Sequence, residues 1–274
     1  MIEFSEVTLK IKDKTILSEI NLSIPDNKTI GIVGKNGSGK SSFLKVMAGI
    51  IKPTNGKVKV FNYIPHKKNK EFLKQISFVN PQKGILDYSL PAIDFYKFLA
   101  KVYKINKKDF MNKVEYFGKM LDIKDKIHQP VRLLSFGERV KCEVLAKLIH
   151  SPKLIILDEP FIGIDVDSKN KLIEFLKMQK KERKTIFIVT HEINILSEIV
   201  DELIIFDKGK ILRRFKESEI EHFKELKKVD YVFSDGTTKS EIINKFKVPD
   251  ISLKNIKSIQ INDITIEDIL RELV

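Results

Sequence analysis

Residues 34–41 read Gly-Lys-Asn-Gly-Ser-Gly-Lys-Ser, a glycine-rich loop between an apolar strand pattern at 29–33 and a helical pattern at 41–48. Glycines let the backbone curl so that its N–H groups point at phosphate oxygens. The N-terminus of the following helix adds the positive end of its dipole. This stretch therefore predicts an α/β core that binds a nucleoside triphosphate.

Two side chains of the loop carry specific chemistry. Lys40 supplies a cation for the phosphates, and the Ser41 hydroxyl is a ligand for Mg²⁺. An ordinary turn is the alternative interpretation, and the strand-loop-helix context disfavours it. The nucleotide contacts expected in this segment are Gly34, Asn36, Gly37, Ser38, Gly39, Lys40, Ser41 and Ser42.

Length and composition allow one sizeable α/β domain with an appendage, because the chain has 274 residues, 42% hydrophobic and 32% charged. No apolar run reaches the roughly eighteen residues of a membrane span, and residues 1–4 do not resemble a secretion signal. We therefore expect a cytoplasmic protein. The single cysteine, Cys142, falls in a helical pattern and is expected to be a buried, inert thiol.

The formal net charge of +13 raises the question of a nucleic acid or an anionic membrane as partner. The lysines are scattered in short pairs such as 67–68 and 180–181, which is typical of solvated helix faces and turns. We therefore expect no nucleic-acid partner. A functional basic patch stays as the less favoured alternative.

The first part of the chain predicts strands. Apolar and polar residues alternate over 2–9 and 16–24 around a turn at 12–14, as in an antiparallel hairpin. Shorter strands are expected at 56–61 and 76–79. The chain therefore begins with an antiparallel β subdomain that leads into the phosphate-loop strand.

The middle of the chain predicts a helical insert over about 84–150, with helical periods at 92–103 and 110–121. Near-continuous aliphatic runs separated by helices follow, as in parallel strands covered on both faces; they lie at 154–157, 186–189 and 203–206. The sequence thus predicts a mostly parallel sheet in an ATPase-type domain that covers residues 1–215.

A small C-terminal α+β domain is predicted over residues 216–274. Its expected elements are a polar helix, a strand, a helix, a second strand and a final helix, at 217–226, 231–233, 241–246, 259–261 and the C-terminus. Thr265 and Asp268 suit a capping box for the final helix.

A second group of motifs narrows the function. Residues 134–138 read Leu-Ser-Phe-Gly-Glu, and their Ser135 lies 23 residues before Asp158, which ends the 154–157 strand and is followed by Glu159. Asp158, at the carboxyl end of a buried strand, is suited to hold Mg²⁺ through water opposite Ser41. Together with Gln82, Asp165 and His191, these motifs resemble the ATP-binding-cassette family over residues 2–211.

The resemblance assigns expected roles. Glu159 orients or deprotonates the attacking water, His191 hydrogen-bonds the γ-phosphate, and Gln82 joins Ser41 and Asp158 at the metal. With Lys40, Glu159 and His191 form the expected catalytic set. The resemblance also places Ser135, Gly137 and Asp165 against the ATP of a second copy, in a head-to-tail homodimer around two Mg-ATP.

Less specific interpretations of these residues stay open: a helix N-cap for Ser135, a structural histidine for His191, an exposed glutamine for Gln82 and a structural turn for Asp165. The aromatic residue that stacks on adenine in the family is absent near Ile11, so we expect aliphatic packing or Phe4 to contact the base. The signature motif of the family, here residues 134–138, carries Phe136 and Glu138 where glycine and glutamine are common.

The signature segment and the C-terminal residues 265–273 are similar to the ATPase subunits of bacterial multidrug, antibiotic and sodium exporters. This resemblance implies a separate transmembrane permease as partner and a location at the inner face of the cell membrane. Two alternatives are an importer ATPase of the energy-coupling-factor type and a soluble ATPase that acts on ribosomes or nucleic acid.

Overall fold

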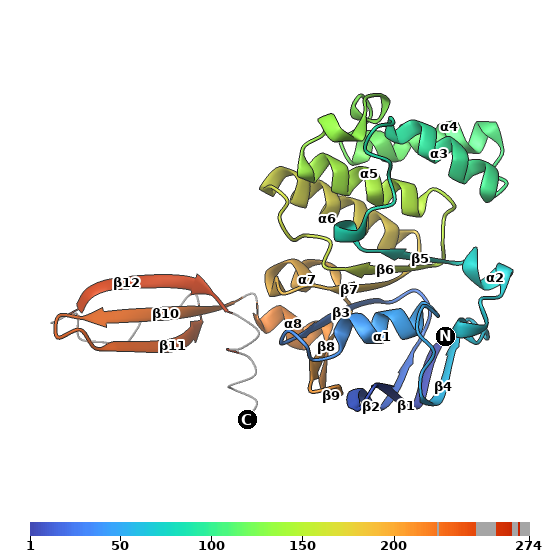
Figure 1. Cartoon of the computed structure of the whole chain (residues 1–274). Coiled ribbons are helices and arrows are strands. Elements are labelled where there is room, and N and C mark those ends of the chain that lie inside the picture. The colour runs from blue at the N-terminus through green and yellow to red at the C-terminus, as the bar shows by residue number, and fades with distance from the viewer. Residues whose placement is uncertain (224, 245–255, 265–267, 269–274) are drawn as a thin grey trace.

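The computed structural model describes residues 1–223, 225–244, 256–264 and 268 (Figure 1). Three sheets organise these residues, with the strand orders β2-β1-β4, β5-β6-β7-β3-β8-β9 and β11-β10-β12. The first two sheets and their helices form an α/β body, residues 1–216, and the third sheet projects from this body (Figure 1).

The central sheet is parallel except at one edge. Its parallel strands are β5 (Ile76–Val79), β6 (Leu154–Asp158), β7 (Thr185–Val189), β3 (Thr29–Gly34) and β8 (Glu202–Asp207). The edge strand β9 (Lys210–Lys216) pairs antiparallel with β8. Every residue of β3, β6 and β7 is buried, which confirms the prediction from the aliphatic runs.

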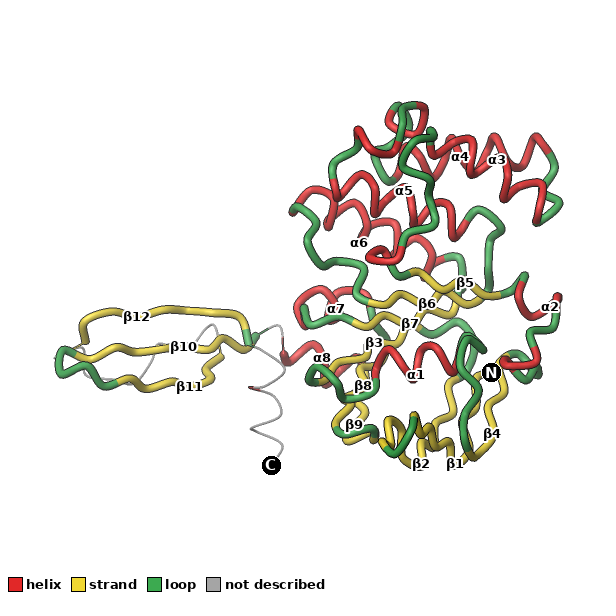
Figure 2. Tube along the Cα trace, viewed as in Figure 1, coloured by secondary structure: helices red, strands yellow, loops and turns green. Residues whose placement is uncertain are grey.

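Both faces of this sheet are covered, because successive side chains of a strand point to opposite faces. Ile155 and Leu157 join a core with helices α5 (Phe136–Leu148), α6 (Val166–Lys181) and α7 (Ile193–Ile199). Leu154 and Ile156 join a second core with α1 (Lys40–Met47) and the N-terminal sheet. Figure 2 shows α1 between the two sheets.

The N-terminal sheet confirms the predicted hairpin. Strands β1 (Ile2–Ile11) and β2 (Lys14–Ile24) are antiparallel, and β4 (Asn55–Val60) pairs with the other edge of β1. The helical insert is also confirmed, with α3 (Ala92–Val102), α4 (Lys107–Met120) and α5. A short helix, α2 (Lys70–Leu73), precedes β5.

Cys142 lies on α5 and is fully buried, as predicted. Burial raises the pKa of its thiol to about 12, so the reactive thiolate is suppressed near neutral pH.

The C-terminal unit differs from the prediction. Helix α8 (Glu217–Phe223) ends earlier than expected, and β10 (Leu226–Phe233) follows it. The helix predicted near 241–246 is wrong, because β11 (Thr238–Asn244) is a strand that pairs with β10, as does β12 (Ile256–Asp263). The predicted final helix lies outside the described residues except for Asp268. Thr265 of its expected capping box also lies outside them.

Cross-strand pairing explains this difference. The β-branched Ile242 and Ile243 lie opposite Lys228 and Lys227 of β10, and their pairing in a sheet outweighs a weak helical period. A turn at Gly236, with a φ of 85°, joins β10 to β11.

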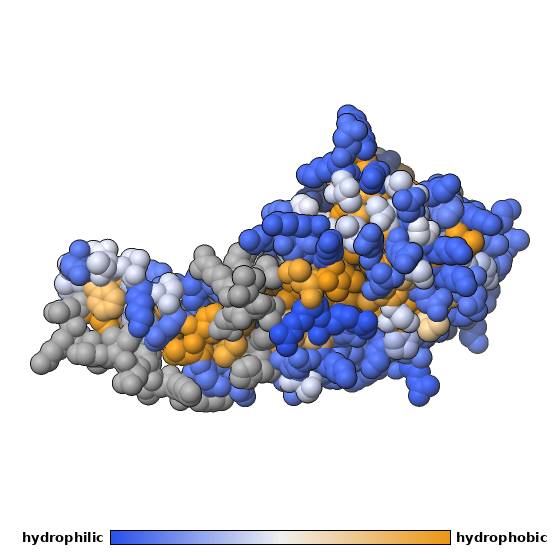
Figure 3. Space-filling model, turned by 90° about the horizontal axis from the view of Figure 1, so that it is seen from below, coloured by the Kyte–Doolittle hydropathy of each residue, from blue (hydrophilic) through white to orange (hydrophobic). Residues whose placement is uncertain are grey.

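The surface seen from below is largely hydrophilic at the periphery of the molecule, and hydrophobic side chains gather near its middle (Figure 3). Among the residues that the structure describes, no helix combines the length and the apolar character needed to cross a membrane.

Candidate nucleotide-binding site

The phosphate loop leaves the buried strand β3 and enters α1 at Lys40. Its bends require glycine. A Cβ on Gly34 would lie 2.1 Å from the Phe206 carbonyl oxygen, and a Cβ on Gly39 would lie 2.8 Å from that of Ile16. Gly39 also caps α1 with a φ of 105°, which glycine adopts without steric cost. The predicted loop therefore folds as a tight curl between the sheet and the helix.

Lys40 places its charge inside this curl. Its Nζ donates to the carbonyl oxygens of Gly34, at 2.7 Å, and Lys35, at 2.9 Å, and the residue is only 6% exposed. The Ser38 Oγ is buried there without a hydrogen-bond partner among the described residues. A buried cation and an unpaired hydroxyl suit a phosphate group, because its oxygens accept from both.

Asp158 ends β6 next to the loop and is 3% exposed. Its Oδ1 accepts from the Ser41 Oγ at 2.9 Å, and its Oδ2 accepts from the Asn80 Nδ2 at 3.2 Å. A hydroxyl and a carboxylate are oxygen ligands of the kind that Mg²⁺ prefers. The residues present therefore fit a magnesium ion shared with a nucleotide.

Asn80 was missed by the sequence analysis. It follows β5, whose Val79 pairs with Leu157 of β6, so Asn80 comes to lie beside Asp158. The only signal in the sequence is an amide directly after a short aliphatic strand.

Glu159 adopts a left-handed backbone with a φ of 53°, an uncommon conformation for a non-glycine residue that clusters at functional sites. Its N–H donates to the Val189 carbonyl oxygen at 2.9 Å. Burial is the largest cause that raises the pKa of its carboxyl, to about 7, and the neighbouring Asp158 adds to this. A carboxyl poised near neutral pH can accept a proton from water.

His191 lies beside Glu159. It follows β7, the strand next to β6, and its Nε2 is 3.1 Å from the Glu159 Oε1. The other carboxyl oxygen, Oε2, is buried without a partner among the described residues. The structure thus brings together three predicted features: the phosphate loop, Asp158 and the Glu159–His191 pair.

A pocket of about 320 Å³ opens over these residues and is lined by Lys14, Ile16, Asn36, Gly37, Gly39, Lys40, Ser41, Ser42 and Glu159. Lys14 and Ile16 come from β2 and were not predicted. The expectation that Phe4 contacts the base is wrong, because Phe4 is 3% exposed and stacks on Phe43 at 4.6 Å between ring centroids. Ile16 lines the pocket and supplies an aliphatic side chain that could pack against the base.

The signature residues lie elsewhere. Ser135 caps α5 in a capping box, in which its Oγ accepts from the Glu138 N–H at 3.2 Å and its own N–H donates to the Glu138 Oε2 at 2.8 Å. The Lys126 Nζ lies 3.0 Å from the Glu138 Oε1. Glu138 therefore stabilises the start of α5 although glutamine is common at this position.

Gly137 touches the start of α6. A Cβ on it would lie 2.3 Å from the Ser168 Oγ and 2.5 Å from the Asp165 Oδ2. Asp165 caps α6 by accepting from the Ser168 N–H at 2.8 Å, so its structural role here is that of a helix N-cap rather than of a turn. Its predicted contact with ATP stays a prediction.

A second pocket, of about 440 Å³, contains Ser135, Glu138, Lys141, Asp165 and Ser168 among its lining residues. It shares no lining residue with the phosphate-loop pocket. Gln82, in the turn Pro81–Lys83, is exposed and lines neither pocket. The hydrogen bonds of the Asp158 carboxylate go to Ser41 and Asn80, and the role of Gln82 at the metal stays a prediction.

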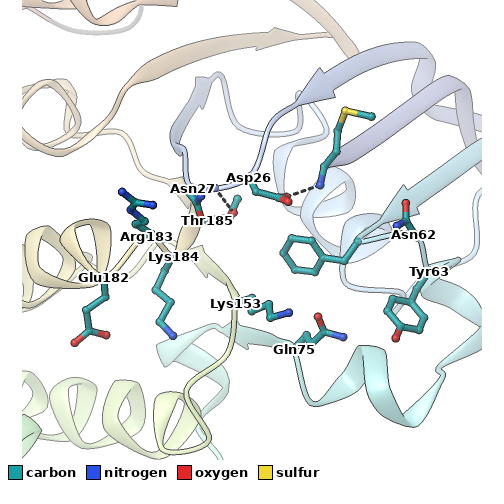
Figure 4. Close-up of a pocket in the computed structure, with 12 residues that line it drawn as sticks. Asp26, Asn27, Asn62, Tyr63, Gln75, Lys153, Glu182, Arg183, Lys184 and Thr185 are labelled. Atoms are coloured by element: carbon teal, nitrogen blue, oxygen red, sulfur yellow. Dashed lines mark hydrogen bonds and ion pairs between the residues drawn. The ribbon is translucent and has the colours of Figure 1, made fainter.

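A larger pocket, of about 620 Å³, lies at the amino ends of the parallel strands, at the opposite end from the phosphate loop (Figure 4). Asn27, Lys153 and Lys184 line it just before β3, β6 and β7 begin, whereas Gly34 and Asp158 end two of these strands. Asp26, also in its lining, pairs with the amino group of Met1. None of the predicted site residues lines this pocket.

A phosphate loop on a mostly parallel sheet, with an acidic pair at the end of a neighbouring strand, defines a P-loop nucleotide hydrolase. A family model described as ABC transporter matches residues 17–162, more than half of the chain. The chain therefore belongs to the ATP-binding-cassette (ABC) transporter family. It is an ATP-binding subunit of this class and an ATPase.

Three curated relatives illustrate this membership. The ABC transporter ATP-binding protein NatA of Bacillus subtilis is 25% identical over 85% of this chain and 96% of its own. The zinc import ATP-binding protein ZnuC of Mannheimia succiniciproducens is 34% identical, over 72% and 73%. The linearmycin resistance ATP-binding protein LnrL of Bacillus subtilis is 28% identical, over 77% and 68%.

A solved structure shares the fold. It is a dimeric, post-hydrolysis state of an ATP-binding cassette bound to ADP and Pi. It superposes with a TM-score of 0.69 at 23% identity and covers 79% of this chain and 99% of that one.

Proposed function

We propose that this chain drives a separate membrane permease, as an exporter, by hydrolysing ATP in a head-to-tail homodimer that encloses two Mg-ATP. The observation that carries the catalytic part is Glu159, a carboxyl with a pKa of about 7 that lines the phosphate-loop pocket beside Lys40. Its position and protonation suit a base for the attacking water.

The phosphates would be held by the phosphate loop, by the start of α1 and by Lys40. The loop N–H groups and the start of α1 face the anionic oxygens, and Lys40 offsets their charge. Ser41 and Asp158 would hold Mg²⁺, which, when bound, neutralises charge on the β- and γ-phosphates. His191 keeps the Glu159 carboxyl oriented toward the pocket.

The separation of the two pockets supports a dimer. Ser135 lines a pocket distinct from the phosphate-loop pocket, and Gly137 follows it on α5, so in this proposal one copy supplies half of each site. In a head-to-tail pair, the start of α5 of one copy meets the γ-phosphate bound by the other. A serine hydroxyl and helix N–H groups suit this oxyanion contact.

The direction of transport is proposed from the relatives and the sequence. A relative named for linearmycin resistance and the signature resemblance favour export. Import is the second candidate, because the zinc import protein is 34% identical to this chain. The permease places the protein at the inner face of the membrane, without a nucleic-acid partner.

An apolar groove of about 330 Å³ suits the contact with the permease. Ile50, Ile85, Leu99, Tyr103 and Ala146 are among its lining residues. Ile85 lies three residues after Gln82, so a cytoplasmic apolar segment of the permease in this groove would adjoin the Gln82 loop. Exposed apolar patches and grooves commonly mark sites of protein–protein interaction.

The test is affinity purification of the tagged chain from detergent-solubilised membranes of its native host, with mass spectrometry of the bound proteins. The proposal predicts a polytopic membrane protein, without an extracytoplasmic solute-binding protein. Recovery of a solute-binding protein with the permease would favour import. Recovery of ribosomal proteins or DNA alone would contradict a transport role.

A further inference from the structure

The loop after β5 and helix α5 meet at one buried carboxyl. Glu143 lies on α5 and is 7% exposed. Its Oε1 accepts from the N–H of Ile85 at 2.8 Å and from the N–H of Leu86 at 2.9 Å. Two backbone donors on one carboxyl oxygen make a strong, directional contact in a buried setting.

Gly84 completes this contact from the loop side. A Cβ at Gly84 would lie 2.4 Å from the Glu143 Oε1 and 3.1 Å from its carboxyl carbon. The backbone of Gly84 has a φ of −58°, which any residue adopts, so the close approach to Glu143 is the constraint. The loop is therefore shaped around the carboxyl group.

The contact joins two parts of the candidate site. Gln82 lies two residues before Gly84 on the loop, and Ser135 and Gly137 lie at the start of the helix that carries Glu143. The same helix is held at Cys142, whose carbonyl oxygen accepts from the Tyr96 hydroxyl at 2.9 Å. A displacement of the loop would therefore move α5 as a rigid unit.

We propose that Glu143 is a positioning residue that fixes the loop of residues 82–86 to α5, so that the loop and the signature residues move together. This inference rests on the proposed function, because it supplies the link between permease binding and the ATP site. Ile85, which donates to Glu143, also lines the apolar groove, and so does Ala146 of α5. An occupant of the groove thus contacts both partners of the link.

The first test is hydrogen exchange of the Ile85 and Leu86 amides in the full chain. Glu143→Ala removes the acceptor, and exchange of both amides should become roughly tenfold faster, the size expected for one net hydrogen bond. Glu143→Gln keeps a carbonyl oxygen at the same place. In this variant the Ile85 and Leu86 amides should exchange at close to the parent rate.

The second test is steady-state ATPase kinetics with nucleotide binding measured separately. Glu143→Ala should lower kcat by roughly tenfold or more through misplacement of the signature residues, and Glu143→Gln should restore most of it. The Kd for Mg-ATP on the isolated chain should change less than twofold, because the phosphate loop does not contact Glu143.

A variant on the loop side guards against simple misfolding of the Glu143 variants. Gly84→Ala leaves Glu143 intact but forces the carboxyl away, so it should lower kcat and speed amide exchange as Glu143→Ala does. The control is Gly118→Ala on α4, whose added Cβ would meet its nearest atom at 3.4 Å, an ordinary contact.

Three results would overturn the inference. One is a Glu143→Ala variant that exchanges these amides like the parent, and another is faster exchange with unchanged kcat. The third is an equal loss of kcat in Glu143→Ala and Glu143→Gln. Failure of the proposed function looks different: Glu159→Gln would keep the turnover of the parent, whatever the Ile85 and Leu86 amides do.

Discussion

The His191 Nε2 lies 3.1 Å from the Glu159 Oε1, at the carboxyl ends of two adjacent parallel strands. Because the Glu159 side chain is only 17% exposed, the contact sets the position of a largely desolvated carboxyl. This pair and the Ser41–Asp158 hydrogen bond lie together at the carboxyl ends of the parallel strands, where we propose that ATP is hydrolysed.

The Glu159 carboxyl should give ATP hydrolysis a dependence on pH. Burial raises its pKa to about 7, and only the deprotonated form accepts a proton from water. We expect kcat/KM to rise with pH up to about 7 and to level off above it. The measurement is kcat/KM from pH 5.5 to 9; a profile that falls over this range would contradict the assignment.

The same shift should make stability depend on pH. The folded state holds the Glu159 proton more tightly than the unfolded state, so this group favours folding at low pH. Its contribution is lost as the pH rises from the ordinary carboxyl range toward about 7. Glu159→Gln lacks this loss, so its Tm should exceed that of the parent by a few degrees at pH 8 and by less at pH 5.

Thermal unfolding of both chains without nucleotide provides this comparison. An equal Tm difference at pH 5 and pH 8 would show that Glu159 has an ordinary pKa.

Ser41→Ala should weaken the use of magnesium. The change removes the hydroxyl that donates to Asp158 and that is suited to ligate Mg²⁺. We expect ATPase activity to fall by roughly a hundredfold, with a higher magnesium concentration at half-maximal rate. A magnesium titration of the ATPase rate measures both effects.

Ser197→Ala is a matched control, because the Ser197 hydroxyl donates to the Asn194 carbonyl oxygen on α7. An unchanged magnesium requirement in Ser41→Ala would remove Ser41 from the metal site.

Gly137→Ala should separate nucleotide binding from hydrolysis. The added methyl would collide with Ser168 and Asp165 and displace the start of α5. Binding of Mg-ATP to the phosphate loop should stay within about twofold of the parent, while kcat falls at least roughly tenfold. Equilibrium binding and steady-state kinetics test this pair of outcomes; equal losses in both would argue against a separate role for Gly137.

The proposed contact between the apolar groove and the permease can be tested by introducing a charged side chain into the groove. Ile50 lines it and is 53% exposed, so Ile50→Glu should abolish co-purification of the permease without unfolding the chain. Val102→Glu is the control, since Val102 is 57% exposed and does not line the groove. Quantitative mass spectrometry of tagged chains from membranes compares them. Equal recovery of the permease with both variants would place its contact elsewhere.

The phosphate loop, Asp158 and Glu159 could be predicted because their chemistry is local in sequence. Each follows a buried aliphatic strand, and the carboxyl ends of parallel strands share one edge of a sheet. The burial of both faces of the parallel sheet and the helical insert could be predicted for a similar reason, since the hydrophobic pattern reports which faces are buried.

Contacts between distant segments could not be predicted. Asn80 meets Asp158 only because β5 pairs with β6, a register that no local pattern specifies. Glu143 looks like an exposed helix residue in the sequence, and its partners lie 57 and 58 residues away. The helix predicted near 241–246 is wrong because β11 ends only at Asn244, and its pairing with β10 outweighs local helix propensity.

The most direct test of the central claim is ATPase activity and oligomeric state of Glu159→Gln with Mg-ATP. The substitution keeps the size of the side chain and removes the base, so turnover should fall by at least roughly a hundredfold. ATP should then hold a stable dimer in sedimentation velocity, while the parent returns to monomers as it hydrolyses ATP. A variant that hydrolyses ATP at the parent rate, or that stays monomeric with saturating Mg-ATP, would contradict the account.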